Sequence, residues 1–122
     1  MPYNVIDLTK DLIACPSVTP KDKGAQVYLS EKLEALGFEC HHLPFGDGDA
    51  IVPNLFARLG GGSPHICFAG HTDVVPAGAE DRWTYGPFNS HIEDGVLYGR
   101  GASDMKGAVV AFAAAVSEFL EH

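Results

Sequence analysis

Basic residues are scarce in this sequence, and no stretch of the chain gathers them. Eight Lys and Arg residues stand against sixteen Asp and Glu residues, which gives a formal net charge of -8. A protein that binds a nucleic-acid backbone needs clustered cations to neutralise successive phosphates. We therefore expect no nucleic-acid partner.

The sequence also lacks an apolar run long enough to cross a membrane. Residues 1–12 alternate polar and apolar side chains and include acidic ones. This pattern fits neither a basic segment followed by an apolar signal core nor a membrane-spanning helix. We expect a cytoplasmic protein with no membrane partner.

Cysteine is rare, and the sequence has no internal repeat or low-complexity tract. The three cysteines, Cys15, Cys40 and Cys67, are far apart and form no Cys-x-x-Cys pair. Their number and spacing favour neither a disulfide framework nor a structural zinc site. We predict reduced, buried thiols.

The composition is that of an ordinary globular domain, with 46% hydrophobic and 20% charged residues in 122 residues. Apolar residues recur at helical spacing over residues 5–14 and 22–36, and an alanine-rich apolar stretch covers residues 108–120. These three segments are predicted helices. Because the last of them is apolar on most sides, we expect other elements to cover most of its surface.

Several short segments between the helices have the composition of strands. Residues 38–43 and 54–59 predict two strands joined by a long turn-rich loop, and residues 90–93 and 96–98 predict a hairpin. Residues 65–70 form an apolar run bounded by glycine, which predicts a sheet strand covered on both faces. A structured loop is expected over residues 74–89. A strand and helix unit normally continues into another strand, so we expect this sheet to lack at least one strand here.

The first group of residues with chemical potential is His71 and Asp73, directly after the apolar run. Residues two apart project the same way from an extended chain, and α/β proteins place ligands at the carboxyl ends of strands. An imidazole with a nearby carboxylate suits a zinc ligand and its orienting acceptor. Taken alone, the pair favours a hydrogen-bonded surface contact over a metal site, because a bare His-x-Asp is common.

The second group is the segment GRGASDMKG at residues 99–107, which places Asp104 where a helix begins. A glycine-rich dinucleotide loop is excluded, because the carboxylate would repel a pyrophosphate at the helix N-terminus. Asp104 can instead bridge two cations, or it can accept a hydrogen bond as the N-cap of the following helix. Spacing alone favours the cap.

The order of several motifs carries a family resemblance. An apolar strand is followed by GHTDVVP at residues 70–76, EDRW at 80–83, PF at 87–88 and DGVLYGRGASDMKG at 94–107. The chain resembles the aminoacylase and carboxypeptidase superfamily of co-catalytic zinc hydrolases from about residue 5 to the last helix. The resemblance implies an α/β fold, a three-layer catalytic domain with a mixed central sheet, of which residues 1–122 would be the N-terminal part.

The resemblance also implies roles for three side chains. His71 would bind one metal ion, Asp73 would orient and polarise His71, and Asp104 would bridge both ions next to a cis Asp104–Met105 peptide. The implied cofactors are two divalent ions, zinc first and cobalt second. Residues 70–107 are closest to bacterial enzymes that remove succinate from an N-succinyl diamino acid, with deacetylases of acetylornithine as the alternative. The implied full-length enzyme is a homodimer that acts on this small molecule.

The family supplies its general base from a Glu-Glu pair about thirty residues beyond the DMKG motif, and further metal ligands and a lid and dimerisation domain follow. The chain contains none of these. Glu118 and Glu121 lie about 20 to 25 Å along the helix from Asp104 at about 1.5 Å per residue. We therefore expect the chain alone to bind metal weakly and to hydrolyse nothing. A non-catalytic relic or binding fragment remains the second class of explanation.

Aromatic residues and other histidines receive no catalytic role. Trp83, Tyr85 and Phe88 can wall a cleft, but packing of the long loop is the favoured interpretation. The remaining histidines match no motif, and we expect exposed or ordinary hydrogen-bonded positions for them: His41, His42, His65, His91 and His122.

Overall fold

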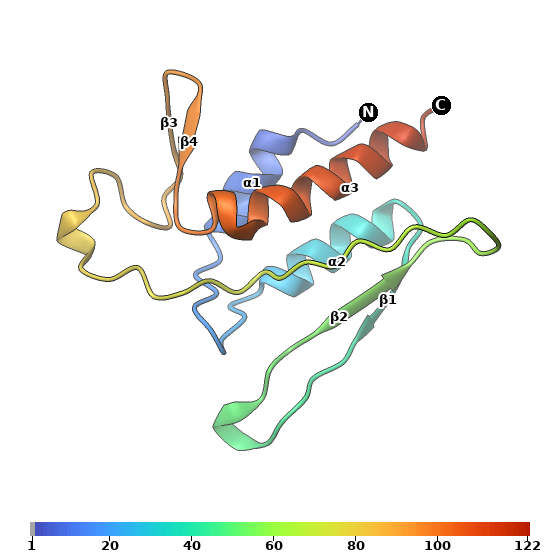
Figure 1. Ribbon diagram of the computed structural model, residues 1–122, viewed down its shortest axis with the longest axis horizontal. Helices are drawn as coiled ribbons and strands as arrows, with labels where there is room; N and C mark the ends of the chain where they lie inside the picture. Colours follow the sequence, from blue (N-terminus) through green and yellow to red (C-terminus); the bar gives the residue numbers. More distant parts are fainter. Residues whose placement is uncertain (1) are drawn as a thin grey trace.

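The computed structural model describes residues 2–122 as three helices with two small hairpins beside them (Figure 1). The helices are α1 (Val5–Ile13), α2 (Ala25–Ala35) and α3 (Gly107–Phe119), and the strands are β1 (Glu39–His42), β2 (Leu55–Arg58), β3 (His91–Glu93) and β4 (Val96–Tyr98). Three short helical turns complete the chain: η1 (Gly48–Ala50), η2 (Glu80–Arg82) and η3 (Ala102–Lys106). All three predicted helices are confirmed, as are the two strands predicted over residues 38–43 and 54–59 and the hairpin predicted over residues 90–98.

Helix α1 begins at a side-chain cap. The Oδ1 atom of Asn4 accepts hydrogen bonds from the backbone N–H groups of Ile6 at 2.9 Å and Asp7 at 3.0 Å. These bonds satisfy two of the donors that the first turn of a helix leaves without partners. Pro16 follows the last turn and cannot continue it.

The core lies where the three helices meet. It contains Leu8 and Leu12 of α1, Ala25 of α2, and Val109 and Val110 of α3. Leu12 has no exposed surface, and Val110 is 1% exposed. Leu8 and Leu12 lie four residues apart on one side of α1, and Val109 and Val110 lie four and three residues before the buried Ala113 on one side of α3.

Helix α3 is covered on one side only. Its buried residues are Val109, Val110, Ala113 and Ser117, whereas Phe119 at its end is 78% exposed. The expectation that other elements cover most of this helix is therefore wrong for residues 2–122. The apolar composition predicted burial of the helix but could not specify which elements would provide it.

The β1–β2 hairpin pairs antiparallel and packs against α2 (Figure 1). Cys40 lies opposite Ala57, and a further bridge between Phe45 and Val52 lengthens the pairing toward the loop. The β3–β4 hairpin is also antiparallel and turns at residues 94–95 as predicted. One parallel bridge joins Val18 to Val74.

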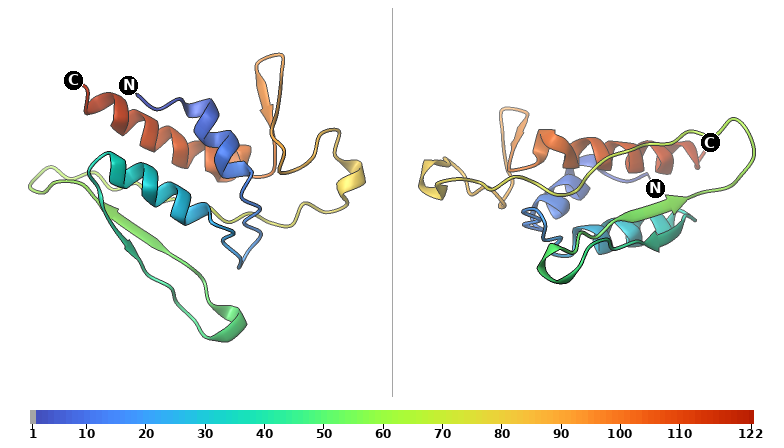
Figure 2. Two further views of the ribbon diagram at one scale, coloured as in Figure 1. Left: turned by 180° about the vertical axis from the view of Figure 1, so that it is seen from behind. Right: turned by 60° about the horizontal axis from the view of Figure 1, so that its bottom comes forward.

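Residues 65–70 do not form the predicted strand. They are extended, yet they take part in no backbone hydrogen bond within the described part of the chain, and Ile66 is 86% exposed. Figure 2 shows this segment passing helices α2 and α3 without a neighbouring strand. An apolar run becomes a sheet strand only when other strands pair with its backbone, and the paired strands of residues 2–122 all lie in the two hairpins.

The cysteine prediction is correct for redox state and wrong for burial. All three thiols are free, but Cys15 and Cys40 are only partly buried and Cys67 is exposed. Cys67 lies in the same unpaired segment, 65–70, so its exposure follows from the missing sheet. Within residues 2–122 no helix is long and apolar enough to cross a membrane.

Candidate metal centre

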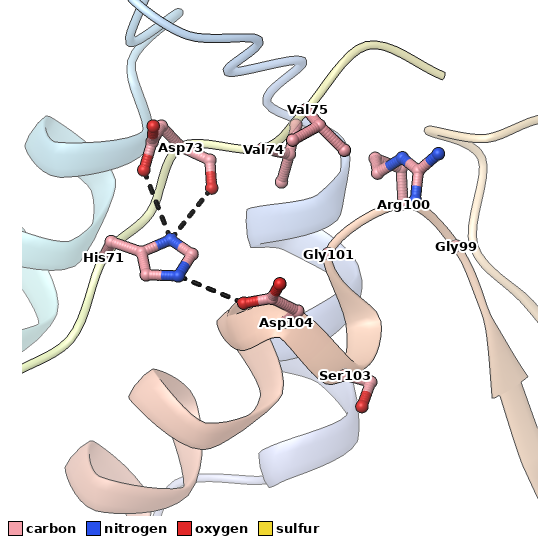
Figure 3. A pocket seen from close by; sticks show the side chains of 9 residues that line it. All are labelled: His71, Asp73, Val74, Val75, Gly99, Arg100, Gly101, Ser103 and Asp104. Atoms are coloured by element: carbon pink, nitrogen blue, oxygen red, sulfur yellow. Dashed lines mark hydrogen bonds and ion pairs between the residues drawn. The ribbon is translucent and has the colours of Figure 1, made fainter. Parts of the chain in front are cut away.

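Two chain segments meet at one end of α3 and form a pocket of about 220 Å³ (Figure 3). The first is the extended stretch that carries His71 and Asp73, and the second is the loop and wide turn that carry Asp104. The structure therefore brings together all three side chains that the sequence singled out. The other lining residues are Val74, Val75, Gly99, Arg100, Gly101 and Ser103.

Gly70 sets the position of His71 by allowing its backbone to approach α3. A Cβ atom added at Gly70 would lie 3.0 Å from Cγ2 of Val109 and 3.3 Å from Cε of Met105. The ring of Phe68 stacks on Phe112 of α3 with centroids 4.9 Å apart, which holds the preceding residues against the same helix. His71 is thereby placed beside the first turn of α3.

Both ring nitrogens of His71 face oxygen atoms (Figure 3). Nδ1 lies 3.0 Å from the backbone oxygen of Asp73 and 3.2 Å from its Oδ1. Nε2 lies 3.1 Å from Oδ1 of Asp104. All three side chains are substantially exposed, at 47% for His71, 50% for Asp73 and 88% for Asp104.

This arrangement fits a cation between His71 and Asp104. The two oxygens of Asp73 beside Nδ1 favour the tautomer with its N–H at Nδ1, and that tautomer has a lone pair on Nε2. A carboxylate also offers only lone pairs, so the facing Nε2 and Oδ1 atoms need a proton or a metal ion between them. A tetrahedral zinc ion about 2.0 to 2.1 Å from each of two donors separates them by roughly 3.3 Å, close to the 3.1 Å observed.

Asp104 does not cap α3, so the competing interpretation of this residue is wrong. No side chain makes a capping hydrogen bond at the start of α3 or of the preceding turn η3. Asp104 has non-helical dihedral angles (φ -122°, ψ 93°), and the Asp104–Met105 peptide is cis, as the resemblance implied. The carboxylate points at His71, with Oδ1 3.1 Å from Nε2 (Figure 3).

Arg100 lies on the same pocket with one of its nitrogens unpaired. Its guanidinium lies over the ring of Trp83, 5.2 Å from the centroid, and Nη2 donates to the backbone oxygen of Pro76 at 3.3 Å. The buried Nε atom has no hydrogen-bond partner. The indole N–H of Trp83 donates to the backbone oxygen of Ala77 at 2.9 Å, which supports the loop-packing role predicted for this residue.

A second, wider pocket of about 840 Å³ adjoins the first and shares Gly99 and Ser103 with it. Trp83 and Tyr85 line it, together with Arg82. Tyr85 stacks on His91 with centroids 3.6 Å apart and donates a hydrogen bond to Glu93, so this aromatic wall is tied to the β3–β4 hairpin. The two aromatic residues thus both pack the loop and border a cavity.

Sequence reasoning missed Ser17 and Lys106, which are the two fully buried polar side chains nearest the site. Both are 0% exposed. Lys106 donates through Nζ to the backbone oxygen of Cys15 at 2.9 Å, and Ser17 donates to the backbone oxygen of Thr72 at 2.7 Å. Burial lowers the pKa of Lys106, and the nearby Cys15 and Asp22 oppose that shift. The sequence signal that could have identified Lys106 as a buried residue is its position directly before an apolar helix.

The described residues supply an incomplete set of metal ligands. No group of three or more His, Cys, Asp or Glu side chains in residues 2–122 is arranged to hold a metal ion. Glu118 lies in the last turn of α3, and Glu121 follows the end of that helix. His71 and Asp104 are thus the candidate ligands, and a closed tetrahedral site needs at least two more.

Similarity to known proteins covers the region of this pocket. Residues 67–122 match the model of peptidase family M20/M25/M40. Over 117 residues the chain is 61% identical to a succinyl-diaminopimelate desuccinylase of Rhodospirillum centenum and 55% identical to one of Ehrlichia canis. These alignments cover 95% and 96% of the chain but 30% and 31% of the relatives, so the chain spans about a third of their length.

Solved structures share the fold over nearly the whole chain. Human carnosine dipeptidase 1 superposes with a TM-score of 0.78 at 32% identity, covering 97% of this chain and 29% of that one. A metallo-carboxypeptidase of Sulfolobus solfataricus superposes with a TM-score of 0.81 at 24% identity, covering 98% of this chain and 28% of that one. The α/β fold class is confirmed. Together with the sequence matches, these structures show that the chain is similar to members of peptidase family M20/M25/M40.

Proposed function

We propose that His71 and Asp104 hold divalent metal ions and that the protein containing this chain uses them to hydrolyse an amide bond. The observation that carries this proposal is that Nε2 of His71 faces Oδ1 of Asp104 at 3.1 Å. Zinc is the first candidate, because imidazole and carboxylate are among its usual ligands, and cobalt accepts the same donors. Two ions are proposed, with Asp104 as the bridging carboxylate.

A bound pair of ions would polarise the amide carbonyl and lower the pKa of a bound water. The residues of this chain prepare the site for that chemistry. Asp73 would accept a hydrogen bond from Nδ1–H of His71, which favours the tautomer whose Nε2 lone pair faces the site. Asp104 offers its second carboxylate oxygen for a second ion, since Oδ1 already faces His71.

The proposed substrate is N-succinyl-LL-2,6-diaminopimelate, cleaved to succinate and the free diamino acid during synthesis of lysine and peptidoglycan precursors. Relatives named for this activity are 53–61% identical to the chain, which supports the assignment. We place the reaction in the cytoplasm and propose that the whole enzyme is a homodimer. The wider pocket beside Trp83 and Tyr85 offers room for the body of such a substrate.

We propose that residues 1–122 form the N-terminal portion of the metal-dependent catalytic domain, with the lid and dimerisation domain outside them. The general base and the remaining metal ligands are also proposed to lie outside residues 1–122. The 122-residue chain by itself should bind metal weakly and release no measurable succinate.

The proposal is tested on the protein as its source cell makes it. An antibody raised against this chain would isolate the native product, whose size and hydrolysis of N-succinyl-LL-2,6-diaminopimelate would be measured with zinc or cobalt. We expect a polypeptide about three times as long as the chain, because the matched region is 30% of the relatives, and a succinate release that His71→Ala abolishes. Faster cleavage of N-acetylornithine would instead assign a deacetylase, and no hydrolysis of either compound would favour a binding fragment.

A further inference from the structure

We infer that residues 15–19, which connect α1 to α2, act as a clamp that sets the distance between His71 and Asp104, with Ser17 and Lys106 as positioning residues. The inference rests on the proposed metal site and goes beyond it, because neither side chain contacts the facing His71 and Asp104 atoms. It explains how two ligands that lie 33 residues apart in sequence stay 3.1 Å apart. We call residues 15–19 the clamp.

On one side the clamp fixes the backbone that carries His71. The Ser17 hydroxyl donates to the backbone oxygen of Thr72 at 2.7 Å, and Thr72 stands directly between His71 and Asp73. The backbone of Val74 donates to Ser17 at 2.9 Å. Thr19 donates in turn to Val74 at 3.0 Å.

These contacts are decisive because the chain before His71 has no strand partner. Residues 65–71 make no backbone hydrogen bond with other described residues, so only side-chain packing, at Phe68 and Gly70, positions His71 from that side. Ser17 is 0% exposed and Thr72 is 8% exposed, so water cannot readily replace their hydrogen bond. The direction of His71 and Asp73 therefore depends on the clamp.

On the other side the clamp holds the turn that carries Asp104. Lys106, two residues later, is 0% exposed and donates from Nζ to the backbone oxygen of Cys15 at 2.9 Å. That oxygen follows the last turn of α1, where the helix dipole presents its negative end and favours a cation. A buried ammonium is costly without acceptors, so Lys106 ties η3 firmly to this carbonyl.

A close contact between the two sides completes the arrangement. A Cβ atom added at Gly101 would lie 2.8 Å from Cγ1 of Val74 and 3.2 Å from Cδ of Lys106. Val74 is 4% exposed, so the two segments touch without intervening water. The clamp thus fixes Thr72 through the Ser17 hydroxyl and fixes η3 through the backbone oxygen of Cys15. Because Cys15 and Ser17 are only two residues apart, the same short segment holds both sides of the site.

The test measures binding of Co²⁺ alone to the 122-residue chain by NMR titration of amide signals, which reports even weak binding. Ser17→Ala should weaken Co²⁺ binding about tenfold, in the range seen when the groups that orient metal ligands are removed. It should also shift the amide signals of residues 71–74 before metal is added. Ser17→Thr keeps the hydroxyl and should restore most of the affinity.

Ser30→Ala is the matched control, since Ser30 is 4% exposed and donates to the backbone oxygen of Val27 at 2.9 Å within α2. It should lower the denaturation midpoint in chelator about as much as Ser17→Ala and leave Co²⁺ affinity unchanged. Equal affinities for the Ser17→Ala and Ser30→Ala variants would overturn the clamp.

Lys106 is tested by Lys106→Arg, which keeps the cation, and by Lys106→Met, which removes it. We expect the Arg variant to bind Co²⁺ more tightly than the Met variant. If Lys106→Met does not fold, the Ser17 series decides the question. His71→Ala separates the two proposals. If the His71→Ala variant binds Co²⁺ as tightly as the wild type, the proposed metal site is wrong. If His71→Ala lowers Co²⁺ affinity and Ser17→Ala does not, only the clamp is rejected.

Discussion

His71 Nε2 lies 3.1 Å from Asp104 Oδ1, and 33 residues of sequence separate the two side chains. The contact joins an extended segment to a helical turn, so it depends on tertiary structure rather than local spacing. A ring nitrogen that faces a carboxylate oxygen at this distance has either a proton or a metal ion between the two atoms. The predictions below follow from this contact and from the packing that supports it.

Asp73→Asn should weaken metal binding less than loss of His71 itself. The substitution removes the negative charge at 3.2 Å from Nδ1 but leaves the backbone oxygen of Asp73 at 3.0 Å. We expect about a tenfold loss of zinc affinity, the lower end of the usual range for an orienting group, measured by calorimetric titration. Asp81→Asn, in the exposed turn η2, is the control and should leave affinity unchanged. A loss as large as that of His71→Ala would contradict the assignment of Asp73 as an orienting residue.

Gly101→Ala should destabilise the chain by more than Gly24→Ala. Both glycines have nearly the same left-handed backbone, φ +87° and φ +86°, so both substitutions carry a conformational cost of about 1 to 2 kcal/mol. Only at Gly101 does the new Cβ meet a neighbour, 2.8 Å from Val74 Cγ1, whereas Gly24 has open space. Urea denaturation of the two variants isolates the steric difference. Equal losses would show that the contact between Val74 and Gly101 is looser than described.

We expect ionisation of the Tyr28 hydroxyl to lower the free energy of unfolding in alkaline solution. Burial, and then its hydrogen bond to Asp11 at 2.7 Å, raise the pKa of Tyr28 above its ordinary value near 10. The unfolded chain then loses this proton at a lower pH than the folded chain. The stabilisation is therefore complete below about pH 10 and is lost as pH rises above it.

The Tyr28→Phe variant tests this directly, because it cannot ionise at this position. The difference in unfolding free energy between wild type and variant should be constant from pH 7 to 9 and should shrink from about pH 10 upward. A difference that stays constant through pH 11 would show that the hydroxyl of Tyr28 titrates alike in both states.

The sequence predicted those parts of the fold whose signals are local. Helices α1 and α2 follow from apolar periodicity and breakers, α3 follows from its alanine-rich apolar composition, and the β3–β4 hairpin follows from its Asp-Gly turn. Residues 65–70 fit the composition of a strand, but a strand also needs a partner, which composition does not reveal.

The same distinction between local signals and tertiary contacts applies to the residues of the candidate site. His71 and Asp104 were found by residue type and order along the chain, and Asp73 by its spacing from His71. Their contact could not be derived from spacing, because it depends on how the 70–74 and 99–107 segments pack. Ser17 was missed because its role is a hydrogen bond to a backbone oxygen 55 residues away, and a serine leaves no trace of such a partner in sequence.

The most direct test of the account is a zinc titration of the chain by calorimetry with four variants: His71→Ala, Asp104→Asn, the double substitution and His65→Ala. If one ion lies between His71 and Asp104, each single change should lower affinity at least tenfold. The double change should add little to either, because both remove the same site. The exposed His65 serves as the control and should change nothing. Zinc binding that survives both single substitutions would contradict the proposed metal centre.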